Sequence, residues 1–224
     1  MVRIINMKKI ILTFLIFFNL YLAANADVLP YYINSLRRSG VGFSEVKSPL
    51  VMRREPKLEG EILETLHFNF KEEKTICEKN TQKCEIDEVF AAYSKSKKIA
   101  FLTTLDSTEG WNLVCFNQSE MPVCGWVEDE KNKYYTLSEF FDKFGKKYGL
   151  YLFKDLQKTD KVLYAAPVKQ TNSTGSLDMP KVITPWLIRG NWILIKAVDF
   201  QNQMKTGWIN FRGSDGKLKL FVKF

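Results

Sequence analysis

The chain has 224 residues, of which 46% are hydrophobic and 14% aromatic, so it carries enough apolar side chain to fold unaided as one large domain or two small ones. Lys and Arg (33) outnumber Asp and Glu (25), which gives a formal net charge of +8. These basic residues are spread along the chain and form no nucleic-acid-binding motif, so we expect no nucleic-acid partner.

Residues 1–26 have the three-part pattern of a secretory signal peptide. Basic residues precede the apolar run IILTFLIFFNLYLAA, and Ala24-Asn25-Ala26 offers a small-x-small cleavage site. A membrane anchor is the alternative, but this run of about fifteen residues is shorter than the roughly twenty that a spanning helix needs. We expect cleavage after Ala26, no stable membrane insertion of the mature chain, and a periplasmic or secreted protein. Met7, followed by two lysines, is an alternative start to Met1.

The start of the mature chain, residues 27–40, predicts a short helix. The stretch from Pro30 to Arg38 is followed by Gly40, which suits a helix end. Loss of the signal peptide leaves the chain basic, so anionic envelope polymers are the expected electrostatic partners.

Four cysteines, Cys77, Cys84, Cys115 and Cys124, lie in the exported part of the chain. An even number in an oxidising compartment predicts two disulfides, for which three connectivities exist. Zinc is the alternative, but the spacings C-x6-C and C-x8-C are wider than those of zinc knuckles, and the chain has one His. We expect local pairing, Cys77 with Cys84 and Cys115 with Cys124, each bridge closing a hairpin.

The stretch GWNLVCFNQSEMPVCGWV, residues 110–127, predicts the second of these hairpins, with a turn at 118–121 and Leu113 opposite Trp126. Period-two alternation then gives two apolar faces. One carries Trp111, Leu113, the disulfide and Trp126, and the other carries Val114, Phe116, Val123 and Val127. This pattern predicts a hairpin covered on both sides, with Trp111 as a core residue.

A similar pattern recurs at 190–209, GNWILIKAVDFQNQMKTGWI, without cysteines. Trp192 and Trp208 are nearly as far apart as Trp111 and Trp126, and each pair has a Gly-Trp-aliphatic ending. Such internal similarity indicates a duplicated unit, in which Trp192 would also be a core tryptophan.

These residues resemble the bacterial SH3-like (SH3b) domains of exported proteins. The first copy matches at Leu50 to Pro56, at Gly60 to Leu66 and through the hairpin of 110–127. The second matches at Leu163 and Pro167, at Trp192 and at Gly207-Trp208-Ile209. The resemblance implies a mainly β protein with two small SH3-like β-barrels joined by a short helix, the second copy being divergent.

The resemblance sets the domain boundaries at 41–128 for the first domain and 151–224 for the second. The first is longer than the family pattern requires, so we predict a disulfide-bearing insertion at 67–98, which either carries specificity or has no function. The segment 129–150 is predicted to be a helical linker. In it Thr136 and Glu139 form a capping box, and an aromatic stripe follows that we expect to pack between the barrels.

We found no catalytic, metal or cofactor motif in the sequence. His67 has no Ser-His-Asp or Cys-His pattern around it, and disulfide-bonded cysteines supply no thiolate nucleophile. Glycosidase chemistry needs two carboxylates, and the candidates are Asp106, Glu109, Glu128 and Asp129. Carboxylates near turns are more often simply solvated.

We therefore expect a non-catalytic exported binding protein of the bacterial cell envelope, recognising a cell-wall peptide or glycan or an envelope protein. The alternatives are a secreted effector or inhibitor that binds a protein, and a small cell-wall hydrolase. Candidate ligand contacts are Trp186, in the loop-like stretch 184–186, and Tyr164 and Arg53 at the groove edges of the two copies.

Overall fold

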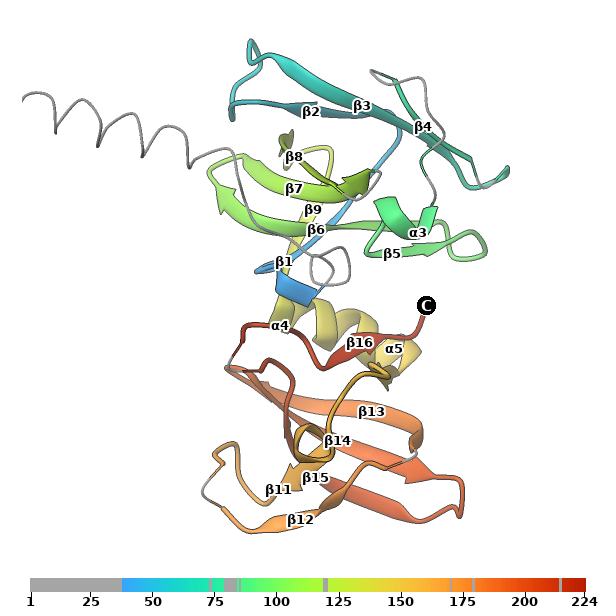
Figure 1. The fold of residues 1–224 in the computed structure, drawn as a ribbon, viewed down its shortest axis with the longest axis vertical. Helices are drawn as coiled ribbons and strands as arrows, with labels where there is room; N and C mark the ends of the chain where they lie inside the picture. The colour runs from blue at the N-terminus through green and yellow to red at the C-terminus, as the bar shows by residue number, and fades with distance from the viewer. Residues whose placement is uncertain are drawn as a thin grey trace, which may run out of the picture. The chain divides into compact units, whose positions relative to one another are not determined.

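The computed structural model describes residues 38–72, 74–78, 84, 86–118, 121–169, 171–178, 180–213 and 215–224. The predicted signal peptide and all but the last three residues of the predicted helical segment 27–40 lie outside them. In the described part of the chain, no helix is long and apolar enough to cross a membrane. The protein is mainly β, as predicted, and its strands form two antiparallel sheets (Figure 1).

The first sheet has nine strands. They are β1 (Gly42–Glu45), β2 (Leu50–Arg53), β3 (Ile62–Asn69), β4 (Lys74–Cys77), β5 (Ala92–Ser94), β6 (Ile99–Thr108), β7 (Trp111–Gln118), β8 (Met121–Glu128) and β9 (Lys133–Thr136). Their order is β4-β3-β2-β8-β7-β6-β1-β9, and β5 pairs with β6 outside this path. The predicted insertion at 67–98 therefore begins inside β3 and adds β4, β5 and the short helix α3 (Ile86–Val89).

The second sheet has seven strands. They are β10 (Leu150–Leu152), β11 (Val162–Tyr164), β12 (Ser173–Ser176), β13 (Pro180–Arg189), β14 (Trp192–Asp199), β15 (Met204–Asn210) and β16 (Leu220–Val222), with the 3-10 turn η2 (Lys158–Lys161) before β11. Their order is β12-β11-β15-β14-β13-β10-β16. When β4 and β5 are left out, the strand order of the first sheet is β3-β2-β8-β7-β6-β1-β9. Each of these strands then matches the strand at the same place in the second sheet.

The β7–β8 hairpin has the predicted register. Leu113 lies opposite Trp126, Cys115 opposite Cys124, and Gln118 opposite Met121. Cys115 and Cys124 form a disulfide across the two strands, so this pairing is confirmed.

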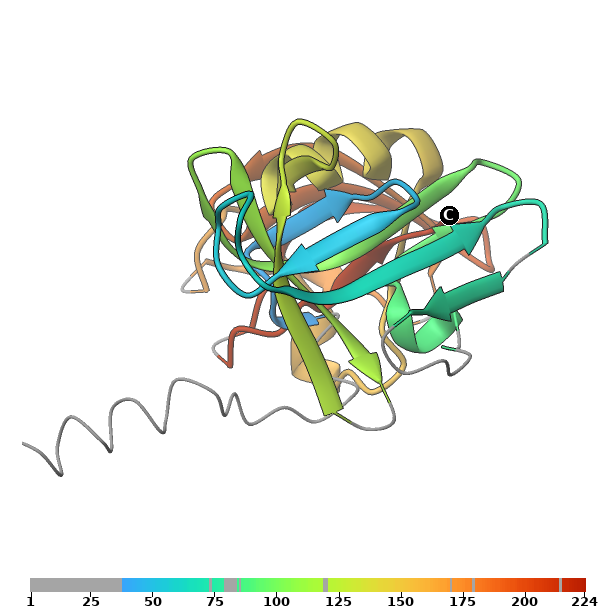
Figure 2. The same cartoon turned by 90° about the horizontal axis from the view of Figure 1, so that it is seen from above.

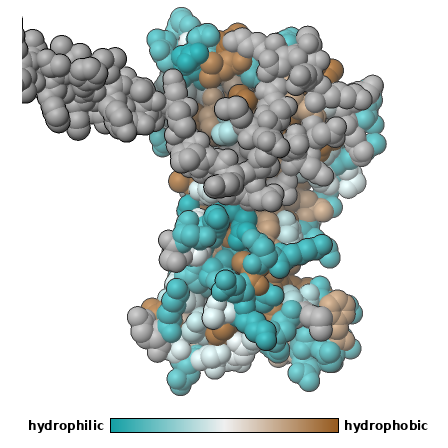
Figure 3. Space-filling model, viewed as in Figure 1, coloured by the Kyte–Doolittle hydropathy of each residue, from teal (hydrophilic) through white to brown (hydrophobic). Residues whose placement is uncertain are grey.

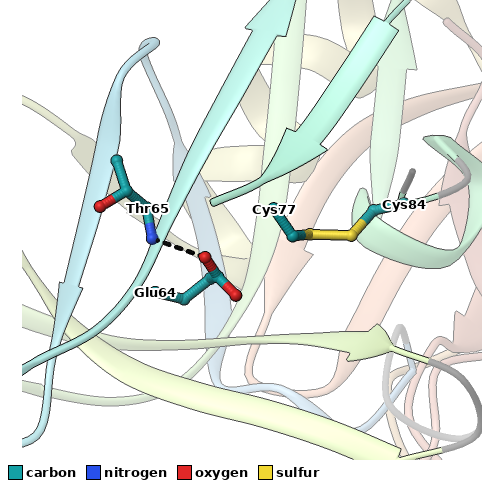
Figure 4. Close-up of a disulfide and its surroundings, with 4 residues drawn as sticks. All are labelled: Glu64, Thr65, Cys77 and Cys84. Atoms are coloured by element: carbon teal, nitrogen blue, oxygen red, sulfur yellow. Dashed lines mark hydrogen bonds between the residues drawn. A yellow bond between two sulfur atoms is a disulfide. The ribbon is translucent and has the colours of Figure 1, made fainter. Parts of the chain in front are cut away.

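The Cys77–Cys84 disulfide is also confirmed, whereas the tip of the hairpin predicted around it, 79–83, lies outside the described residues. Strand β4, which ends at Cys77, pairs with β3, and the amide of Cys84 donates to the carbonyl oxygen of Thr75 on β4 at 3.4 Å before helix α3 begins (Figure 4). The bridge thus ties the sheet to α3. Beside it, the buried Glu64 carboxylate accepts a hydrogen bond from the amide of Thr65. Local cysteine spacing predicts the bond, but it carries no information about which strand β4 pairs with.

One helical segment joins the sheets, made of α4 (Leu137–Phe140), the π-helical turn η1 (Phe141–Gly145) and α5 (Lys146–Tyr148). The predicted capping box is present, because Thr136 accepts from the Glu139 amide and the Glu139 carboxylate accepts from the Thr136 amide. The hydrogen bonds that the Glu139 carboxylate accepts from the amide and the hydroxyl of Thr136 lower the pKa of Glu139. The linker predicted at 129–150 is helical only from 137 to 148, since 133–136 form β9, which pairs with β1.

The helical segment contributes to a core that both sheets share (Figures 1 and 2). Phe140, Phe141 and Phe144 of the helix are at most 5% exposed. They cluster with Phe43 and Phe101 of the first sheet. From the second sheet and its flanking segment come Ile183, Ile193, Ile209, Phe211 and Phe221. A second cluster, which includes Leu50, Met52, Leu66, Val114 and Phe116, lies within the first sheet.

The glycine of each Gly-Trp pair is required by close strand packing. A Cβ at Gly125 would lie 2.8 Å from Cβ of Met52 on β2, and a Cβ at Gly207 would lie 2.9 Å from Cβ of Leu163 on β11. Any larger residue would push the last hairpin strand away from its neighbour. The motif thus marks the same strand pairing in both sheets.

Candidate functional site

The side chains of strand β14 alternate between a buried face of the second sheet and an open one. Ile193, Ile195 and Ala197 are at most 2% exposed and belong to the shared core. The residues that alternate with them point the other way and are half-buried: Trp192, Leu194, Lys196 and Val198. We call these four residues, together with those paired to them on β13 and β15, the outer face of the second sheet.

An apolar row crosses the outer face. Leu187 on β13, Leu194 on β14 and Trp208 on β15 are successive register partners, and Tyr164 on β11 continues the row. Leu187 is 42% exposed, whereas Trp208 is only 7% exposed. The row therefore exposes apolar side-chain surface across four strands, although the ring of Trp208 is nearly buried.

Two aromatic contacts organise this row. The rings of Tyr164 and Trp192 meet edge to face, with centroids 5.6 Å apart. The guanidinium of Arg189, which is the register partner of Trp192, lies 5.8 Å from the centre of the Trp208 ring. Edge-to-face packing and a cation over a ring both hold aromatic side chains in fixed positions. The outer face thus presents pre-positioned rings beside an exposed positive charge. Figure 3 shows polar and apolar areas mixed over the part of the molecule that contains the second sheet.

The tryptophans predicted to be core residues are not in the core. Trp111 and Trp192 are both half-buried, and the core sides of their strands are Val114 with Phe116 and Ile193 with Ile195. Alternation assigns residues to two faces, but it does not say which face another element covers. Trp192 was therefore missed as a site residue, and its only sequence signal was its place in an alternating pattern with apolar residues on both faces.

Replacing Trp111 by alanine should accordingly lower the free energy of unfolding by only about 1–2 kcal/mol, because part of the ring is already in water. Replacing Phe116, which is 1% exposed on the opposite face of the hairpin, by alanine should lower the free energy of unfolding by about 3–5 kcal/mol. Chemical denaturation of Trp111→Ala and Phe116→Ala measures both. Equal losses would show that the two faces have been assigned wrongly.

Of the predicted ligand contacts, only Tyr164 lies in the apolar row of the second sheet. Trp186 lies in strand β13 and not in a loop, at a bulge between Pro185 and Leu187, where it is 54% exposed. Arg53 belongs to the first sheet, where it faces Trp126 and donates from Nη1 to the carbonyl oxygen of Gly60 at 2.9 Å. Tyr164 and Arg53 do occupy matching places, since each is paired with the tryptophan of a Gly-Trp motif.

The first sheet carries a corresponding row. Asp106, Leu113, Trp126 and Arg53 are successive register partners on β6, β7, β8 and β2. The register also shifts between Thr104 and Asp106, as it does between Pro185 and Leu187, so both sheets have an irregularity at the same place. The residue skipped there is Leu105 in the first sheet and Trp186 in the second.

Three of the four candidate carboxylates of a hydrolase hold turns or an ion pair, and the fourth, Glu109, is exposed. Asp106 accepts from the amide of Ser107, and Asp129 accepts from Nδ2 of Asn112 and the amide of Tyr134. Glu128 pairs with Lys131 at 2.7 Å. His67 likewise lies 3.3 Å from Glu78, with 43% of its side chain exposed. These contacts are those of structural surface groups.

The most perturbed titratable group, Tyr135, has structural partners. Burial, followed by the charge and hydrogen bond of Glu45, raises its pKa to about 12. Its hydroxyl donates to Glu45 on β1 and accepts from Lys143 of η1. This neutral tyrosine therefore joins β9 to β1 and to the helical segment. Within the described ranges, no group of three or more His, Cys, Asp or Glu is arranged to hold a metal ion.

Comparison with known proteins adds no assignment. No family model matches the chain, and no curated protein is similar to it. The class of protein is therefore defined by the structure alone: a mainly β protein with two antiparallel sheets. Its two disulfides are typical of an oxidising, exported environment.

Proposed function

We propose that this is a non-catalytic binding protein of the bacterial cell envelope, periplasmic or secreted, built from two SH3-like domains. The identical strand order of the two sheets supports the duplication, as does the matching place of Trp126 and Trp208. The ligand is a cell-wall polymer or an envelope protein, in keeping with the basic mature chain.

The observation that carries this proposal is the outer face of the second sheet. Side chains of Tyr164, Trp192 and Leu187 lie at the surface although the strands beneath them are fully paired. Half-buried rings held in place by neighbours lose little conformational freedom on binding, which favours recognition of flat apolar surfaces such as sugar rings. No described carboxylate or histidine has contacts that point to a reaction.

Purified mature protein should sediment with isolated cell-wall sacculi, and Trp192→Ala should weaken this binding about tenfold, as expected for the loss of one stacking ring. The matched control is Phe200→Ala, which removes a 65% exposed ring beyond the end of β14. Phe200→Ala should keep the parental thermal midpoint, whereas Trp192→Ala removes a half-buried ring and should lower the free energy of unfolding by about 1–2 kcal/mol, so binding is compared at a temperature where both variants are folded. Parental protein that stays in the supernatant, or equal loss in both variants, would contradict a binding role for this face.

A further inference from the structure

The outer faces of the two sheets carry different charges at matching positions. In the first sheet Asp106 is the register partner of Leu113, and Glu128 that of Trp111. In the second sheet the matching partners are Leu187 for Leu194 and Asn210 for Trp192. Two carboxylates of the first face are thus replaced by uncharged side chains in the second.

The second face also gains positive charge. Arg189 occupies the place of Thr108, and Lys196 the place of Cys115. Arg189 is exposed and Lys196 is half-buried. None of the outer-face residues on β13, β14 and β15 is acidic. Asp199, at the end of β14, accepts from the amides of Gln201 and Gln203 in the following turn. The aromatic rings of this face therefore lie in a field that favours an anion.

The polar groups of the face suit a sugar better than an extended peptide. Thr184, Lys196 and Thr206 form a polar row directly beside the apolar row. Backbone donors of β14 are already used on both sides by β13 and β15, so an added peptide strand would find no free edge there. Lys196 lies on the same face of β14 as Trp192, four residues further along, with Thr184 and Thr206 on either side of it. Aromatic rings, hydroxyl groups and a lysine on one sheet face match sugar rings that bear hydroxyl and carboxylate groups.

We propose that the outer face of the second sheet binds a carboxylate-bearing polysaccharide. Trp192 and Tyr164 contact sugar rings, and Arg189 and Lys196 pair with the carboxylates. The first face has a weaker preference of this kind, because Asp106 and Glu128 repel the same ligand and oppose the single cation of its row, Arg53, which stands where the second face has Tyr164. This inference rests on the proposed binding function and adds to it a ligand class and a choice between the two faces.

Polygalacturonate, a uronic acid polymer, is the probe, and dextran is its neutral counterpart. The intact disulfide-bonded protein should bind polygalacturonate, with affinity that falls as salt rises, and should not bind dextran. Arg189→Gln and Lys196→Gln should each weaken binding roughly fivefold, as expected for one exposed charge pair. Lys131→Gln, which removes a 69% exposed lysine from the first sheet's last turn, is the control and should bind like the parent.

The aromatic positions separate the two faces. Trp192→Ala should weaken polygalacturonate binding about tenfold, whereas Trp111→Ala at the matching place should leave it unchanged. Equal loss in both variants, binding of dextran as tight as that of polygalacturonate, or full competition by polyglutamate would overturn the inference. Parental protein that sediments with sacculi but ignores polygalacturonate would overturn the inference while the proposed function stands. Parental protein that binds neither would remove both.

Discussion

Replacing Phe140 by alanine should lower the free energy of unfolding by about 3–5 kcal/mol, as expected for a large aromatic side chain that is fully buried. Its ring centroid lies 4.4 Å from that of Phe43 and 5.2 Å from that of Phe101, both in the first sheet. It also lies 5.6 Å from the ring of Phe221 in the second sheet. One substitution in the helical segment should therefore weaken both sheets together.

The measurement is denaturant unfolding followed by two probes. Tryptophan emission reports on both sheets, through Trp111 and Trp126 in the first and Trp186, Trp192 and Trp208 in the second. Far-ultraviolet circular dichroism reports on the strands. The midpoints from both probes should coincide and shift together in Phe140→Ala. Phe200→Ala, with 65% of its residue exposed, should leave them in place. Two separate transitions in Phe140→Ala, or midpoints that differ between the two probes, would show that the shared core does not couple the two sheets.

Removing both disulfides should have an effect of similar size. The bonded cysteines are 7 and 9 residues apart, and closing loops of this length contributes about 2.5 kcal/mol each in the chain-entropy model. We expect about 2.5 kcal/mol of lost stability for either double variant, Cys77→Ala with Cys84→Ala or Cys115→Ala with Cys124→Ala, and about twice that for both together. Alanine avoids placing a hydroxyl in the core beside the buried Cys77.

Additivity is the check on this prediction. The two bridges lie in different strand pairs, so their contributions should sum within experimental error. Thiol titration of the unfolded oxidised protein should also find no free thiol, since both cysteine pairs are bonded. A variant with all four cysteines replaced by alanine that is as stable as the oxidised protein would contradict the stabilising role of the disulfides.

The sequence by itself determined the local features of this protein. Contacts between residues near each other in the chain account for the pairing of Gln118 with Met121, the Leu113–Trp126 register, both disulfides and the capping box at Thr136. Alternation within a strand and side-chain capping act over a few residues, so their signals are complete in a short stretch. Tyr164 was expected at the groove edge of the second copy from the resemblance to SH3-like domains, and the structure pairs it with Trp208, while its contact with a ligand stays a prediction.

Only the tertiary structure decided which faces are open and how the sheets meet. Period-two alternation made Trp192 and Ile193 equally good core residues. Ile193 is the buried one because the helical segment and other strands pack on its side of β14. Trp186 read as a loop residue because Pro185 precedes it, yet β14 pairs on either side of the bulge and keeps it in a strand. Burial depends on what covers a face, and the covering residues come from distant parts of the chain, so no short pattern records it.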